Sequence, residues 1–78
     1  MDINIDSTLD CSGLACPIPI IKTSRAIREL KPGQLLKMIA TDAGSVKDVA
    51  AWAVRTGNQL IAKEEMNGKF IFYIMRTN

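Results

Sequence analysis

The chain has 78 residues, 47% of them hydrophobic and 23% charged, and carries a formal net charge of +2. A chain of this length makes one domain, over residues 1–78, whose small core leaves no cavity for a bulky cofactor. The mild charge falls short of the basic surface that nucleic-acid binding needs, and the absence of histidine removes the commonest general base and metal ligand.

The first predicted element is a strand over residues 3–10, INIDSTLD. Hydrophobic and polar residues alternate there, so Ile3, Ile5 and Leu9 share one side of the strand. We therefore expect one face of this strand to be buried and the other to face water.

A helix is predicted next, from Pro17 to the KPG run at residues 31–33. Proline cannot continue a helix there, and glycine permits the turn that follows. The side chains expected to face the core are Ile20, Thr23, Ala26, Ile27 and Leu30. The remaining positions are largely polar, so the pattern indicates a surface helix with one packed face.

A second strand is predicted over residues 34–41, and a second helix follows it. The segment SVKD is typical of a capping box, with Ser45 as the N-cap and Asp48 three residues later. This helix is expected to stop at Gly57. The residues predicted on its buried face are Val46, Val49, Ala50, Ala53 and Val54.

Two further strands, residues 58–65 and 69–75, flank Asn67-Gly68, a strong hairpin signal. The last strand is apolar on both faces. It is either a central strand covered by neighbouring side chains or a sheet face that contacts another protein. The order predicts an α/β fold, a βαβαββ two-layer sandwich in which both helices cover one face of a four-stranded mixed sheet. Its first two strands are parallel, through a right-handed crossover.

The segment CSGLACPIPI, residues 11–20, carries the strongest candidate for chemistry. Pro17 suits the first helical position and Pro19 still lies in the first turn, so Cys16 is expected at the N-cap, after a turn that Gly13 allows. The free N–H groups and the dipole of a helix start both favour a thiolate. We therefore predict that the pKa of the Cys16 thiol is lowered and that Cys16 is the catalytic residue. The alternative is that Cys16 is a small apolar residue that packs in the corner between the helix and the strand.

Four neighbours of Cys16 are candidate docking residues. Ile18 and Ile21 lie outside the expected core face, and exposed isoleucines beside a reactive thiol suit contact with another protein. Lys22 and Arg25 follow one or two turns later and suit an anionic sulfur species or an acidic partner. A solvated helix face would explain the two cations equally well.

Cys11 is expected to be a partly buried residue at the end of the first strand. The alternative is an accessory thiol that accepts sulfur or forms a disulfide with Cys16. The separation of the two cysteines is longer than the C-x-x-C of redox dithiols. A metal site needs more ligands than two thiols, and Asp6, Asp10 or Asp42 would complete an unusual zinc set, so we predict no metal.

The segment MDINID is acidic and polar where a signal peptide would be basic and then apolar. Apolar runs in the chain stay below the ~18 residues of a membrane span. We therefore expect a cytoplasmic protein with reduced thiols that contacts no membrane.

The sequence LDCSGLACPIPIIKT resembles the signature of the TusA/SirA sulfur-carrier family, in which Leu-Asp-x-x-Gly-Leu-x-Cys-Pro-x-Pro opens the first helix. GQLLKMIATDAG, VKDVAAWAVRTGNQL and FIFYIMR resemble later family segments in the same order. The resemblance implies the same βαβαββ fold and no metal or organic cofactor. It also implies that Cys16 takes sulfane sulfur as a persulfide from a cysteine desulfurase, a rhodanese or a DsrE-type protein. An acceptor protein in tRNA thiolation, molybdenum-cofactor maturation or dissimilatory sulfur oxidation then receives the sulfur.

The chain departs from the family pattern at three places. Asp42-Ala43 stands where many members have Asp-Pro, and Gly57-Asn58 where many have Gly-His. Ile18 lies between the prolines, where many tRNA-thiolation members have glutamate. These differences do not affect the assignment of Cys16, but they leave the identity of the partner protein undetermined. Asp42 is a further candidate docking residue.

The leading hypothesis is a sulfurtransferase-like carrier, a role in which thiol exchange needs no acid–base residue beyond the thiolate. A regulatory or RNA-binding module without sulfur transfer is the first alternative. The modest charge and few aromatic residues disfavour that module, which would bind RNA with a steep salt dependence. A dithiol redox protein that uses Cys11 and Cys16 is the second alternative.

Overall fold

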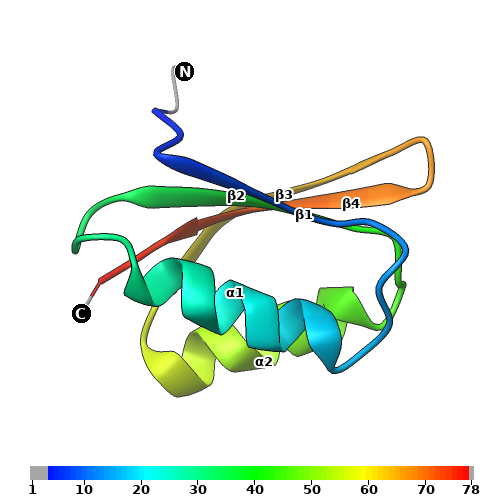
Figure 1. Ribbon diagram of the computed structural model, residues 1–78, viewed down its shortest axis with the longest axis horizontal. Coiled ribbons are helices and arrows are strands. Elements are labelled where there is room, and N and C mark those ends of the chain that lie inside the picture. The colour runs from blue at the N-terminus through cyan, green and yellow to red at the C-terminus, as the bar shows by residue number, and fades with distance from the viewer. Residues whose placement is uncertain (1–3, 78) are drawn as a thin grey trace.

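The structure is a computed structural model and describes residues 4–77. Its elements are β1 (Ser7–Cys11), α1 (Ile18–Arg28), β2 (Leu35–Ala40), α2 (Ser45–Thr56), β3 (Gln59–Met66) and β4 (Lys69–Met75). The strands form one sheet in the order β1-β2-β4-β3, and both helices cover the same face of it (Figure 1). The predicted two-layer α/β sandwich with βαβαββ order is confirmed.

The sheet is mixed, because β1 and β2 run parallel whereas β4 is antiparallel to both β2 and β3. Side chains alternate between the two faces of a strand, so every second residue of the central strands points toward the helices. Most residues of β2 and β4 that do so are fully buried: Leu36, Met38, Ala40, Phe72 and Ile74. They form the centre of the hydrophobic core.

The apolar character of β4 on both faces follows from its central position. Tyr73 alternates with the core residues of β4 and therefore lies on the sheet face away from the helices. It is nevertheless only 9% exposed, because its strand lies between β2 and β3. The burial of Tyr73 therefore agrees with the first of the two expectations for this strand, a central strand covered by neighbouring side chains.

The first strand begins later than its sequence pattern predicts. Ile3 lies outside the described residues, and Ile5 precedes β1 with 40% of its surface exposed. The pairing explains this start, because Ser7 pairs with Leu36 and β2 itself begins only at Leu35. The alternation of the sequence therefore runs past the end of the sheet.

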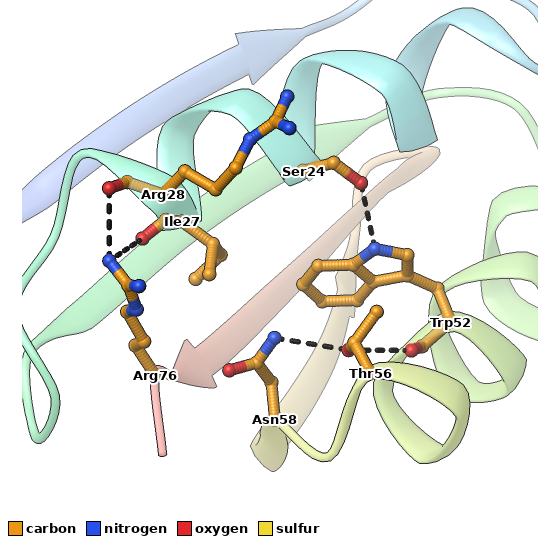
Figure 2. A pocket seen from close by; sticks show the side chains of 7 residues that line it. All are labelled: Ser24, Ile27, Arg28, Trp52, Thr56, Asn58 and Arg76. Carbon is orange, nitrogen blue, oxygen red and sulfur yellow. Dashed lines mark hydrogen bonds between the residues drawn. The ribbon is translucent and has the colours of Figure 1, made fainter. Parts of the chain in front are cut away.

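Helix α1 also ends before the predicted stop, since its last residue is Arg28. The final turn is tightened by hydrogen bonds from the N–H groups of Glu29 and Leu30 to the carbonyls three residues back. The guanidinium of Arg76, just beyond β4, donates to carbonyl oxygens at this helix end (Figure 2). A side chain from the far end of the sequence thus satisfies carbonyls that a helix end leaves unpaired.

Helix α2 is rotated relative to the predicted face. Val49 and Ala53 are buried as predicted, but Ala50 is exposed and Val54 is 84% exposed. Trp52 is buried instead. An indole buries far more apolar surface than the alanine that precedes it by two positions, so the helix packs through its tryptophan.

The hairpin between β3 and β4 is confirmed at Asn67-Gly68. Both residues have positive φ, 52° and 77°, as the two-residue turn favoured in hairpins requires. The hairpin sets the antiparallel pairing of Met66 with Lys69.

Candidate functional site

The loop that carries Cys16 leaves the sheet where the parallel strands β1 and β2 both end, and both helices begin at this same end (Figure 1). Gly13 has a φ of 79°, which is strained for any other residue. Its N–H donates to Oγ1 of Thr41, directly after β2, at 2.8 Å. This glycine therefore holds the β1–α1 loop against the end of β2.

Cys16 lies one residue before the N-cap of α1, whereas the sequence predicted it at the N-cap itself. The N-cap is Pro17, which is joined to Cys16 by a cis peptide bond, and α1 begins at Ile18 with Pro19 buried in its first turn. The N–H of Ile18 donates to the carbonyl of Ala15 at 3.0 Å, so a tight turn precedes the helix. The thiol is carried on this turn, where Cys16 is exposed.

Asp42 ties this turn to the start of α2. Its Oδ2 accepts the backbone N–H of Cys16 at 3.1 Å, and its Oδ1 accepts the N–H of Gly44 at 3.2 Å. Its carbonyl also accepts the N–H of Ser45 at 3.0 Å. One aspartate therefore fixes the backbone of Cys16 relative to the second helix.

The predicted capping box at the start of α2 does not form. Gly44 is the N-cap, and Ser45 is the first helical residue, 1% exposed. Asp48 lies in the first turn of α2, where its backbone N–H donates to the carbonyl of Gly44 at 3.1 Å. The acidic side chain expected to cap its own helix therefore makes no cap hydrogen bond, and its negative charge acts on the Cys16 thiol instead.

The prediction of a lowered pKa for Cys16 is wrong in direction. The hydrogen bond to Asp48 raises the pKa of the Cys16 thiol, as do partial desolvation and the negative charges of Asp48 and Asp42. An acceptor for the S–H group stabilises the neutral thiol, and adjacent carboxylates destabilise the thiolate. Both carboxylates belong to a later part of the chain, so the residues around the start of α1 do not indicate them.

The candidate docking residues of α1 lie on its solvent-facing side, close to Cys16 in the chain. Ile18 is 41% exposed and Ile21 46% exposed. Lys22 and Arg25 are exposed on the same helix. We call these four residues the α1 surface.

Cys11 is a free thiol, as is Cys16. It is fully buried in the core at the end of β1, deeper than the sequence suggests. Burial raises the pKa of its thiol, partly opposed by the charge of Lys22 and reinforced by that of Asp10. Both effects of burial, a high pKa and lack of access, make a thiol unreactive.

A pocket of about 310 Å³ lies between the C-terminal halves of the two helices and the end of β4 (Figure 2). The residues that line it are Ser24, Ile27, Arg28, Trp52, Thr56, Asn58 and Arg76. The indole N–H of Trp52 donates to Oγ of Ser24 at 2.8 Å, and Nδ2 of Asn58 donates to Oγ1 of Thr56 at 3.0 Å. The hydrogen bond between Trp52 and Ser24 thus joins the two helices. The pocket lies toward the other end of α1 from Cys16.

The described part of the chain holds neither a cluster of metal ligands nor a membrane-spanning helix. Among residues 4–77, no group of three or more Cys, Asp and Glu side chains is arranged to hold a metal ion. Within the same range, no helix is both long and apolar enough to cross a membrane.

Comparison with known proteins identifies the family. The family described as sulfurtransferase TusA matches residues 7–76, which is nearly the whole chain. The chain belongs to the TusA family. It is therefore a sulfur carrier, as the resemblance of its CPxP segment implied.

Several relatives in this family are similar in sequence to this protein over nearly its whole length. The sulfur carrier protein TusA of Allochromatium vinosum is 46% identical over 95% of this chain and 97% of that protein. TusA of Pseudomonas aeruginosa is 36% identical over 97% and 96%. A putative sulfur carrier protein of Aquifex aeolicus is 43% identical over 99% of this chain, which spans only 39% of that longer protein.

A solved structure agrees with the fold of the TusA-family chain. The SirA-like protein of Desulfitobacterium hafniense superimposes with a TM-score of 0.81 at 27% identity. The match covers 92% of this chain and 99% of that one.

Proposed function

We propose that this TusA-family protein carries sulfane sulfur as a persulfide on Cys16. The observation that supports this assignment is the contrast between the two cysteines of the sequence, since Cys16 is exposed and Cys11 is buried. Sulfur transfer between proteins needs a sulfur atom that a partner can approach in line with its sulfur–sulfur bond. Cys16 meets this condition on a loop that projects from the end of the sheet.

In the proposed cycle, Cys16 attacks the terminal sulfur of a persulfide on a donor protein, and the sulfur–sulfur bond of the donor breaks. The sulfur is held as Cys16–S–SH and is then attacked by an acceptor nucleophile. Because the sulfur is only handed on, the cycle needs no external oxidant or reductant. The rigid start of α1, with Pro17 at the N-cap and Pro19 in the first turn, supports the presentation of the sulfur.

We infer that donor and acceptor proteins dock on the α1 surface. Exposed Ile18 and Ile21 offer apolar contact, and Lys22 and Arg25 favour a partner with acidic side chains. A cysteine desulfurase, a rhodanese or a DsrE-type protein fits the role of donor. Ile18 between the prolines favours a pathway other than tRNA thiolation, such as sulfur oxidation. A carrier whose Cys16 must remain a thiol suits the reducing cytoplasm.

The test is sulfur uptake measured by intact mass after incubation with a persulfide donor such as glutathione persulfide. The wild-type protein is expected to gain one sulfur atom, as is Cys11→Ala, whereas Cys16→Ser is expected to gain none. Circular dichroism spectra of both variants control for folding. Uptake by Cys16→Ser at the wild-type level would contradict the assignment.

A further inference from the structure

We propose that the pocket between the C-terminal halves of the two helices binds a small organic anion, a molecule with a carboxylate or phosphate group and an apolar part. Cys16 precedes the first turn of α1, whereas the α1 residues that line the pocket begin at Ser24. The pocket is therefore a second site, and the proposal does not depend on sulfur transfer at Cys16.

The pocket is enclosed by parts of the chain that lie far apart in the sequence (Figure 2). Helix α1 contributes three of its lining residues and α2 contributes two, and the segments that follow α2 and β4 contribute one each. Its volume of about 310 Å³ is at the lower end of the range for small-molecule sites, roughly 300–1,000 Å³. A ligand of this pocket would thus be small and would contact both helices and the end of the sheet.

The charges around the pocket favour an anion. Arg28 and Arg76 line it, and none of its lining residues in the described chain is acidic. Helix α1 ends at Arg28 and α2 at Thr56, and each helix end carries the equivalent of about half a negative charge. The guanidinium of Arg76 binds carbonyl oxygens at the end of α1, among them that of Arg28 at 2.9 Å. Two full positive charges outweigh the two partial negative ones, so the pocket is electropositive.

Arg28 is the cation that is open to a ligand. Its side chain is exposed, and its guanidinium forms no ion pair or hydrogen bond with another residue among residues 4–77. A guanidinium presents several N–H groups in one plane, an arrangement that suits the oxygens of a carboxylate or a phosphate. The anionic group of the ligand is therefore expected to pair with Arg28.

The other polar groups that the pocket leaves open are hydrogen-bond donors. Oγ of Ser24 accepts the indole N–H of Trp52 at 2.8 Å, so its own O–H is left to donate. The amide of Asn58 gives one N–H to Thr56 at 3.0 Å, and its Oδ1 accepts the backbone N–H of Thr77 at 3.2 Å. Its second N–H is left. Ionised carboxylate and phosphate oxygens accept hydrogen bonds, so they match these donors.

The apolar part of the pocket comes from Ile27 and Trp52, which also belong to the hydrophobic core. A ligand with an apolar group can contact these two side chains while its charge lies beside Arg28. An inorganic anion has no such group. An organic anion is therefore the class of ligand that uses all the groups of the pocket.

The experiment is a titration of the full, isotope-labelled chain followed by nuclear magnetic resonance at neutral pH. The indole N–H of Trp52, the single tryptophan, gives a signal of its own from within the pocket. Phenyl phosphate and benzoate are the anionic probes, and benzyl alcohol is a neutral probe with the same ring. At least one anionic probe is expected to shift the signals of Trp52, Ser24 and Asn58 to saturation, with an affinity ~10-fold or more above that of benzyl alcohol. Comparison of the two anionic probes shows which anionic group the pocket prefers.

Three variants of the chain locate the binding. Arg28→Gln removes the positive charge from an exposed side chain and is expected to weaken binding of the anionic probe ~10-fold or more. Arg55→Gln is the matched control, because Arg55 is exposed in the last turn of α2 and does not line the pocket. It is expected to bind as the wild-type protein does. Asn58→Asp replaces a donor with a negative charge of the same shape and should also weaken binding. Circular dichroism spectra control for folding.

Three results would each overturn the proposal. They are the lack of a saturable shift with either anionic probe at millimolar concentrations, binding of benzyl alcohol as tight as that of the anions, and equal affinities of Arg28→Gln and Arg55→Gln. The sulfur-carrier function is tested apart from it, because Cys16→Ser is expected to bind the probes as the wild-type protein does. If the probes do not bind but sulfur is taken up on Cys16, only the proposal for the pocket fails.

Discussion

At the scale of single residues, the two thiols of the chain differ chiefly in their access to solvent. Cys11 is enclosed by the core, and burial raises the pKa of its thiol. Cys16 is exposed, and hydrogen bonding to a carboxylate raises the pKa of its thiol. Access therefore distinguishes them more than acidity does, and only Cys16 is open to a reagent or a partner.

We predict that iodoacetamide labels Cys16 alone in the native protein. Cys11 should be labelled only when the protein is unfolded in urea, because burial denies access to its thiol. The labelling rate of Cys16 should keep increasing up to a pH above the usual pKa of a cysteine thiol, because the pKa of Cys16 is raised. Mass spectrometry of native and unfolded samples checks both statements. Native labelling of Cys11 at a rate similar to that of Cys16 would contradict them.

The sequence identified the candidate catalytic residue but not its environment. The thiol before the proline pair was evident from local spacing, as was the helix that follows. The pKa of that thiol depends on Asp42 and Asp48, which lie 26 and 32 residues further along the chain. The helix dipole is evident from the local sequence, but these two charges are not, and they help to raise the pKa of Cys16 where the dipole alone would lower it.

At the scale of elements, helix α2 shows how one large side chain sets the packing of a helix. The sequence pattern offered Val54 for the buried face, but Trp52 occupies the core instead. The small and β-branched residues of α2 are compatible with more than one buried face. Packing against the sheet and α1 determines which of these faces is buried. The hairpin turn at Asn67-Gly68 and the end of α2 at Gly57, which depend on local geometry, were predicted correctly, whereas both helix N-caps and the start of β1 were not.

The same substitution at two positions of α2 tests this packing. Val49→Ala should lower the free energy of unfolding by ~2 kcal/mol, because it leaves a cavity in the core. Val54→Ala should change it by ~0.5 kcal/mol or less, because the side chain is exposed and alanine favours the helix. Urea unfolding followed by the fluorescence of Trp52, the single tryptophan, measures both. Equal losses in the two variants would show that the helix packs as the sequence pattern suggested.

At the scale of the whole molecule, the topology brings the candidate site together. Parallel strands β1 and β2 end at the same edge of the sheet, so the segments that follow them meet there. Cys16 follows β1, whereas Asp42 and Asp48 follow β2. The predicted fold already contained this juxtaposition. The identity of the contacts, in which the Asp42 carboxylate accepts the backbone N–H groups of Cys16 and Gly44, required the structure.

The most direct test of the account locates the transferred sulfur. The wild-type protein is loaded from glutathione persulfide, alkylated to preserve the persulfide, digested and analysed by tandem mass spectrometry. Because Cys11 and Cys16 share the peptide that ends at Lys22, the fragment ions between the two cysteines locate the sulfur. We predict the extra sulfur on Cys16, with Cys11 free of it. Sulfur on Cys11, or loading without any cysteine persulfide, would contradict the assignment.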